Sequence, residues 1–179
     1  MKILPLTIIF LFSFLYFSCS EEKKPEPKKE IKEPEHFDVC DLIEKEDIEK
    51  ILNVKIKDPK KGRSQKGDLT KASFSECSFE SDDESEKIFL SVYLRVTPSS
   101  DEIHSTIQSV RNSFKQSNID VRNVEGVGDV AFWGGNQLHV FQDENNYLII
   151  TILGIKEQYE AIEKTKEVAL QVIRNFGSV

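Results

Sequence analysis

The apolar residues form three patterns along the chain: a continuous run, an interval that almost lacks them, and a long periodic region. The run covers residues 3–17, interrupted by Pro5, Thr7 and Ser13, and the interval covers residues 20–36. From residue 37 onward, apolar positions recur at the spacing of strands or helices. This predicts one folded domain over residues 37–179.

Several segments of the periodic region alternate as strands do: 72–80, 88–96, 121–124, 130–133, 138–142 and 147–153. The clearest alternation places Ile88, Leu90, Val92, Leu94 and Val96 on one face. Residues 147–153 are apolar on both faces, which predicts a strand in the middle of a sheet. Gly134-Gly135-Asn136 predicts a hairpin turn. The Lys-, Gly- and Ser-rich residues 59–71 predict an exposed loop.

Three segments have helical spacing instead: 41–53, 99–118 and 156–176. Ser99 and Glu102 have the spacing of a capping box at the start of the second helix. The side chains expected to face the core from the last helix are Tyr159, Ile162, Ala169, Ile173 and Phe176. Together the segments predict an α+β fold, in which helices pack across an antiparallel β-sheet.

The N-terminal run has the features of an export signal. Lys2 precedes it, and Ser18-Cys19 follows it before a charged stretch begins, so it is too short to span a bilayer as a helix. We expect a signal peptide over 1–18 and a lipid on Cys19. Residues 15–19 resemble the lipobox of bacterial lipoproteins, most closely the looser spirochaete type, although Leu15 stands one position early and bulky residues follow it. The alternatives are an uncleaved anchor and an ordinary secreted protein.

Residues 19–36 predict a disordered spacer, because Lys, Glu and Pro provide too little apolar surface to stabilise a fold. A lipid on Cys19 would then tether the domain to a membrane. The expected location is the bacterial cell envelope, either facing the periplasm or on the cell surface.

The net charge of −7 argues against nucleic acid as a partner, since phosphate binding needs a basic field. It also argues against electrostatic docking onto anionic lipid headgroups.

The chain has three cysteines. If Cys19 carries lipid, Cys40 and Cys77 remain as a pair in an oxidising compartment, which predicts a disulfide. The alternative is two separate buried thiols. A zinc site is poorly supported, since no cluster of His and Cys accompanies the pair.

Candidate catalytic chemistry is sparse. His36, His104 and His139 share no metal-ligand spacing, and each is expected to be a solvated surface histidine. No Gly-x-Ser-x-Gly turn is present, and Gly126-Val127-Gly128 is expected to form a tight bend rather than a nucleotide site. The acidic residues 81–86 lack the ligand pattern of a calcium loop. We therefore assign no catalytic residue, metal or cofactor.

Trp133 lies beside the predicted hairpin turn and is the single tryptophan of the chain. An aromatic residue near a loop tip is a possible partner contact. A position in the core is the favoured interpretation, because a single tryptophan at a strand end more often packs inside.

Two motifs are similar to those of a set of small bacterial cell-envelope lipoproteins. Cys40-Asp41-Leu42-Ile43 resembles their Cys-Asp-Leu-Leu start, and residues 124–133 resemble their Gly-Val-Gly-Asp-x-Ala segment. The resemblance covers roughly residues 38–176. It implies a sandwich similar to the PsbP/LpqN type, and it implies no catalytic residues.

These observations predict a membrane-tethered, non-enzymatic binding or interaction module of the bacterial envelope. The alternative is a surface-exposed structural or host-interaction lipoprotein. An envelope hydrolase is the less favoured third interpretation, and a pocket containing a Ser–His pair would support it. Nothing in the sequence identifies a protein or small-molecule partner beyond the membrane.

Overall fold

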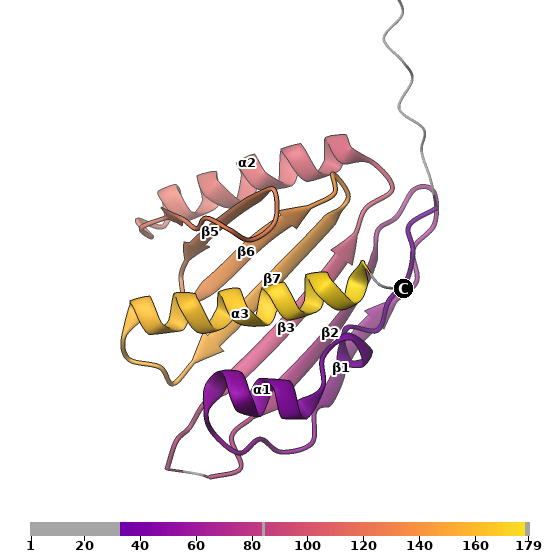
Figure 1. The fold of residues 1–179 in the computed structure, drawn as a ribbon. Coiled ribbons are helices and arrows are strands. Elements are labelled where there is room, and N and C mark those ends of the chain that lie inside the picture. The colour runs from indigo at the N-terminus through magenta and orange to yellow at the C-terminus, as the bar shows by residue number, and fades with distance from the viewer. Residues whose placement is uncertain (1–32, 84, 178–179) are drawn as a thin grey trace, which may run out of the picture.

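A single antiparallel sheet organises the part of the chain that the computed structural model describes, residues 33–83 and 85–177. Its seven strands have the order β1-β2-β3-β7-β6-β5-β4 (Figure 1). The strands are β1 (Lys60–Gln65), β2 (Ser73–Glu80), β3 (Phe89–Val96), β4 (Arg122–Asn123), β5 (Val130–Gly134), β6 (Gln137–Gln142) and β7 (Asn146–Leu153). Strands β4 to β7 thus occur in reverse order across the sheet, which places β7, the last strand in sequence, beside β3.

Helices pack against this sheet, which confirms the expected α+β architecture. They are the short 3-10 helix η1 (Val39–Leu42), α1 (Lys45–Leu52), α2 (Ser100–Gln116) and α3 (Gln158–Phe176). The elements η1, α1 and α3 share one hydrophobic cluster with the sheet, and α2 belongs to a second cluster. Within the described residues, no helix combines the length and apolar character that a membrane span requires.

Strand β7 occupies the central position of the sheet, as its two apolar faces predict. It pairs with β3 from Phe89↔Leu153 to Val96↔Asn146 and with β6 on its other side. Leu148, Ile150 and Ile152 point into the cluster below α3, whereas Tyr147 and Ile149 belong to the α2 cluster. The strand is therefore covered on both faces.

Strand β1 corrects the expectation of a loop over residues 59–71. Lys60–Gln65 pairs with β2, with an irregularity between Lys61 and Ser64. All six residues are exposed, so the strand has no apolar alternation that a sequence pattern could reveal. Lysines and a bulge are features that protect edge strands from pairing with other chains.

Helix α3 faces the core with a stripe that differs from the expected one. Its buried residues are Ala161, Ile162, Thr165, Val168, Ala169 and Val172. Tyr159 is 76% exposed, so its expected core position is wrong. At 100° per residue it lies roughly 120° around the helix from the centre of the stripe. Ile173 and Phe176 are partly buried against the core.

Side chains of α3 also fasten the N-terminal helices. Lys164 Nζ donates to the Ile51 carbonyl at 2.8 Å, and Asn175 Nδ2 donates to the Leu42 carbonyl at 2.8 Å. Both acceptors lie near the ends of helices, where carbonyl groups lack partners within the helix. The C-terminal helix therefore holds η1 and α1 on the sheet.

Ser99 caps the start of α2, but its bond goes to the second residue of the helix rather than to Glu102, the partner expected in a capping box. The Ser99 hydroxyl accepts a hydrogen bond from the Asp101 backbone N–H at 3.2 Å. The Glu102 carboxylate pairs with Arg95 of β3. The acidic residue of the motif thus connects the helix to the sheet.

The glycine-containing turns have the expected roles. Gly135 and Asn136 form the β5–β6 turn with φ values of 58° and 63°, as a two-residue hairpin turn requires. A Cβ on Gly128 would lie 2.5 Å from Val140 Cγ1, so close backbone packing requires glycine there. The Asp129 carboxylate, next in the bend, accepts from the Asp143 backbone N–H at 2.8 Å.

The structure joins Cys40 and Cys77 in a disulfide with an S–S distance of 2.05 Å. Cys40 belongs to η1, and Cys77 is a fully buried residue of β2. The bond therefore links the segment that enters the fold to the sheet. The Asp38 carboxylate supports the same turn, because it accepts from the Cys40 backbone N–H at 3.0 Å.

Loss of this disulfide is expected to lower the free energy of unfolding by about 4 kcal/mol, because the bond closes a loop between residues that are 37 positions apart in the sequence. Urea unfolding of the wild type with and without reductant, and of Cys40→Ala/Cys77→Ala, measures the effect. The control is that reductant leaves the double variant unchanged. Equal midpoints for reduced and oxidised wild type would contradict the prediction.

Candidate functional site

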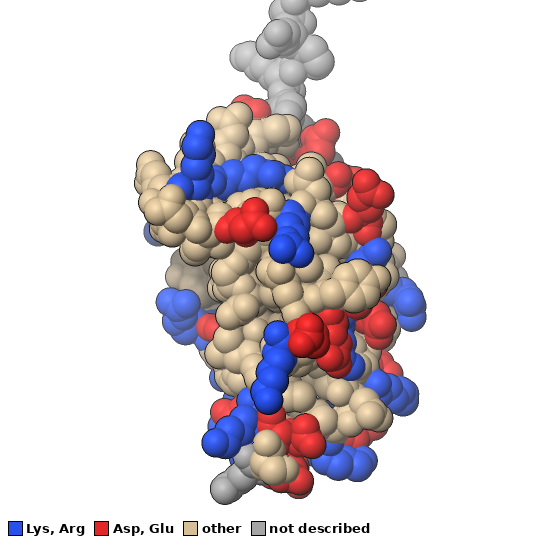
Figure 2. Space-filling view, turned by 90° about the vertical axis from the view of Figure 1, so that its left-hand side faces the viewer, with Lys and Arg blue, Asp and Glu red and all other residues tan. Residues whose placement is uncertain are grey.

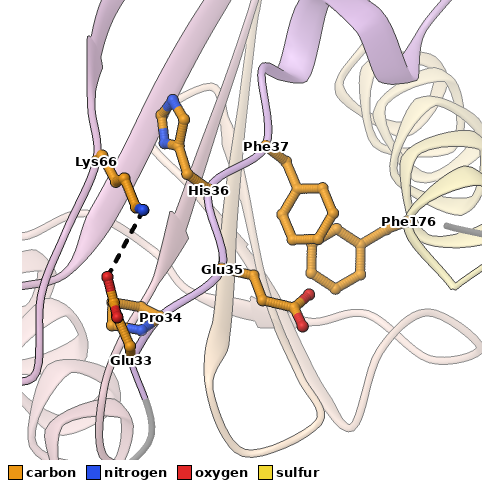
Figure 3. Close-up of a pocket in the computed structure, with 7 residues that line it drawn as sticks. All are labelled: Glu33, Pro34, Glu35, His36, Phe37, Lys66 and Phe176. Atoms are coloured by element: carbon orange, nitrogen blue, oxygen red, sulfur yellow. Dashed lines mark ion pairs between the residues drawn. The ribbon is translucent and has the colours of Figure 1, made fainter.

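A groove of about 780 Å³ lies where the chain enters the fold (Figure 3). Its walls come from the entering segment, from the turn between β1 and β2, and from the end of α3. The lining residues are Glu33, Pro34, Glu35, His36, Phe37, Lys66 and Phe176. This volume lies within the range of about 300–1,000 Å³ typical of small-molecule sites.

Hydrogen bonds and an ion pair attach one wall of the groove to the sheet. His36 Nδ1 lies 2.7 Å from Ser73 Oγ, and His36 Nε2 lies 3.2 Å from Ser64 Oγ. Glu33 pairs with Lys66 at 3.6 Å. The last residues of the predicted spacer, 33–36, therefore contact β1, β2 and the turn between them. His36 is exposed, as expected, but both ring nitrogens have partners.

The hydrogen-bond role of His36 Nδ1 follows from its neighbours. Ser73 Oγ donates to the Gln65 carbonyl at 3.3 Å, so it accepts from His36 Nδ1–H. Ser64 Oγ lies by the other ring nitrogen, Nε2, and its hydroxyl can donate to that nitrogen or accept from it.

Two phenylalanine rings form the apolar part of the groove. Phe37 and Phe176 have ring centroids 4.4 Å apart and an interplanar angle of 52°. Both side chains are partly buried against the main core. The pair closes the gap between the entering chain and the last turn of α3.

The Glu35 carboxylate is the unpaired charge of this site. Its side chain is exposed, and among the described residues it has neither a hydrogen bond nor an ion pair. Figure 3 shows its carboxylate directed toward the phenylalanine pair. Since Lys66 is paired with Glu33, the lining as a whole carries one excess negative charge.

A second candidate surface lies on the face of the sheet opposite α1 and α3. It is the part of that face that does not pack against α2. On it Phe74 and Tyr93 stack with centroids 5.9 Å apart, and burial raises the pKa of Tyr93. Glu76 accepts from Ser91 Oγ at 3.3 Å and pairs with Arg63 at 3.7 Å. The acidic side chain of this face thus has partners, which makes the groove the stronger candidate for a charged ligand.

The surface charges elsewhere are mixed in sign. Figure 2 shows basic and acidic side chains in small neighbouring groups over one side of the molecule. The lysines of the β1 edge are also paired: Lys60 with Glu80 at 3.0 Å, and Lys61 with Asp38 at 2.7 Å. Exposed pairs of this kind contribute little stability, but they neutralise the edge.

His139 corrects the expectation of a surface histidine. It is 3% exposed, and its Nδ1 lies 2.6 Å from the Tyr147 hydroxyl. Phe132 stacks on its ring at 5.1 Å, and Phe114 of α2 meets it edge-on at 5.3 Å. The alternation of β6 was readable, but the sequence did not show that α2 covers this face. His104, in contrast, is exposed on α2.

This aromatic layer binds α2 to the sheet. It contains Phe114, Phe132, His139, Phe141 and Tyr147, and Arg111 lies over the Phe132 ring at 4.2 Å. His139 Nε2 has no hydrogen-bond partner in the described structure. Burial lowers the pKa of His139 to about 4, and it raises the pKa of Tyr147. A neutral histidine is therefore part of the packed state.

Trp133, the possible partner contact, lies in the main core at 1% exposure. Its indole Nε1 is buried without a hydrogen-bond partner among the described residues. The side chain offers almost no surface to a partner in this conformation. Cys19, the predicted lipid acceptor, lies outside the described residues, as do the predicted signal peptide and most of the predicted spacer.

Metal ligands are not gathered anywhere in the described part of the chain: no group of three or more His, Cys, Asp or Glu side chains has the arrangement to hold an ion. No protein family model, no curated protein and no solved structure matches the chain.

Sequence reasoning did not identify Glu33, Glu35, Lys66 or Phe176 as site residues. Phe37 marked the start of the domain, and Phe176 was expected only as a core residue. The available signal was His36-Phe37, an aromatic pair directly after a charged spacer. It indicated where the chain meets the fold, but not which elements meet it there.

The buried histidine generates a prediction for the pH dependence of stability. The unfolded chain takes up a proton near pH 6.5, and the folded chain takes it up near pH 4. Protonation of His139 therefore does not affect the free energy of unfolding above pH 6.5. Below that pH the free energy of unfolding falls, by roughly 3 kcal/mol at pH 4 and about 1.4 kcal/mol per pKa unit.

Urea unfolding across this pH range checks the expectation. His139→Phe/Tyr147→Phe retains the aromatic layer without a titrating group or an unpaired hydroxyl, and it should show a smaller loss. His104→Gln, an exposed control on α2, should behave as the wild type. An identical pH profile for the double variant would show that His139 is not the group responsible.

Proposed function

We propose that the protein is a lipid-anchored, non-enzymatic binding module of the bacterial cell envelope, with its ligand site in the groove. The N-terminal pattern supports the anchor: Lys2, an apolar run and Ser18-Cys19 precede a Lys-, Glu- and Pro-rich spacer. A diacylated or triacylated Cys19 would hold the chain on a membrane stably, since each buried methylene contributes about 0.8 kcal/mol.

The observation that carries the binding role is the unpaired Glu35 carboxylate beside Phe37 and Phe176. Other charges around the groove are neutralised by neighbours, as Glu33 is by Lys66. A concave site with an aromatic wall and one free charge is suited to a ligand that supplies the opposite charge. The resemblance to small envelope lipoproteins of the PsbP/LpqN type supports a module without catalytic residues.

Labelling in cells tests both parts of the proposal. Cells are treated with a small lysine-acylating reagent and then fractionated. The wild type should remain with membranes, and Cys19→Ser should move to the soluble fraction. Lys66, which is 70% exposed in its side chain, should be less modified in membranes than in purified protein, because the groove is occupied. Lys71 is the matched control, since it is exposed outside the groove.

Two results would contradict the proposal. Membrane association of Cys19→Ser equal to that of the wild type would remove the lipid anchor. Equal acylation of Lys66 in membranes and in purified protein, relative to Lys71, would show that the groove has no ligand in cells.

The Ser64–His36 contact is the observation that raises an envelope hydrolase as a second candidate function. Ser64 Oγ can pass its proton to His36 Nε2, the arrangement that activates a nucleophilic serine. The position that normally holds a carboxylate is occupied by the neutral Ser73 hydroxyl at 2.7 Å, so a histidinium ion would lack a charged partner. This difference favours a structural role for the contact.

A fluorophosphonate probe separates the two functions. A binding module should show no labelling above that of Ser64→Ala, because Ser64 is not activated. Labelling of the wild type that disappears in Ser64→Ala and in His36→Gln would establish a reactive serine and support the hydrolase.

A further inference from the structure

We infer that the groove binds an organic ammonium group, carried by a small solute such as choline or by a zwitterionic lipid headgroup. This inference rests on the proposed function, because it names the ligand of the same groove. It follows from charge, from aromatic geometry and from the size of the site.

The charges of the lining select a cation. Lys66 is paired with Glu33, and both ring nitrogens of His36 lie within hydrogen-bond distance of serine hydroxyls. Glu35 is thereby the charge that no neighbour among the described residues neutralises. An anionic ligand would meet this carboxylate, whereas a cation would pair with it.

The phenylalanine pair selects an ammonium group over a metal ion. Phe37 and Phe176 are tilted by 52° with centroids 4.4 Å apart, so they form an angled apolar surface. Cations bound against aromatic rings gain electrostatic attraction to the ring faces, and alkylated ammonium groups fit such surfaces well. A divalent metal ion would need several oxygen ligands, and the described residues provide no such cluster.

The size of the groove allows more than the ammonium group itself. Its volume of about 780 Å³ exceeds the volume of a bare choline, and Lys66 lies across the groove from the phenylalanine pair (Figure 3). A phosphate attached to the ammonium through a short linker would face Lys66 only if Lys66 exchanged its pair with Glu33 for the phosphate. Recognition thus rests on the ammonium end at Glu35 and the phenylalanine pair, and the groove has room for the rest of a headgroup.

Nuclear magnetic resonance titration tests the inference on the mature chain that the proposed function implies, which starts at position 19, with Cys19→Ser in place of the lipidated residue. The probes are choline, tetramethylammonium and inorganic phosphate. Choline and tetramethylammonium should cause saturable shifts at Glu35, Phe37 and Phe176. Affinity should fall roughly fivefold in Glu35→Gln and about threefold in Phe176→Leu, as expected for an exposed ion pair and one cation–ring contact.

Glu125→Gln is the matched control, since Glu125 is an exposed carboxylate outside the groove, and it should bind as the wild type does. Flotation with phosphatidylcholine vesicles, compared with phosphatidylglycerol vesicles, distinguishes the two sources of the group. Binding to phosphatidylcholine identifies a headgroup, whereas shifts with choline but no flotation identify a free solute.

Absence of saturable shifts with both cations would overturn the inference, and so would equal affinity for Glu35→Gln and the wild type. Shifts caused by phosphate alone would overturn it as well. In each case, protection of Lys66 in membranes would leave the groove as a ligand site, so failure of the inference differs from failure of the proposed function.

Discussion

The pairing of β7 with β3 is the interaction on which the whole sheet depends. Strands β1, β2 and β3 form one run of neighbours, and β4, β5, β6 and β7 form another. The pairs from Phe89↔Leu153 to Val96↔Asn146 are the link between the two runs. Because β7 is the last strand in sequence, the sheet closes through contacts between distant residues, which slows folding relative to local pairing.

The parts of the fold that sequence predicts well are those with a local signal. Residues 147–153 are apolar on both faces, and residues 88–96 alternate strictly, so each strand could be placed from its own composition. The disulfide followed from counting cysteines and not from geometry. Strand β1 could not be found in this way, because an edge strand exposed on both faces owes its form to backbone pairing with β2.

Two residues show how burial depends on elements outside the local pattern. Tyr159 has a spacing consistent with the expected stripe of α3, but the stripe that is buried lies on a different side of the helix, so Tyr159 faces solvent. His139 is polar and was therefore expected to be solvated. Helix α2, which connects β3 to β4 in the chain, covers this histidine instead. In both cases the sequence indicates the element correctly, whereas the neighbour that decides exposure is distant.

The groove was beyond sequence reasoning for the same physical reason. Its walls come from residues 33–37, from Lys66 and from Phe176, positions spread over nearly the whole described chain. Each residue taken alone has an ordinary interpretation as spacer, loop or core. Their chemistry becomes visible only when α3 places Phe176 against Phe37.

The Cys40–Cys77 bond also defines how mechanical force would travel through the molecule. A pull on the chain before Phe37 would first load the contacts of Glu33 and His36 with the β1–β2 edge. When these weak contacts yield, tension reaches Cys40 and passes covalently into β2 at the fully buried Cys77. The weak contacts of the entering segment would therefore break first and the disulfide would then carry the tension. The hydrophobic core would bear load only after the weak contacts have broken and the disulfide is under tension.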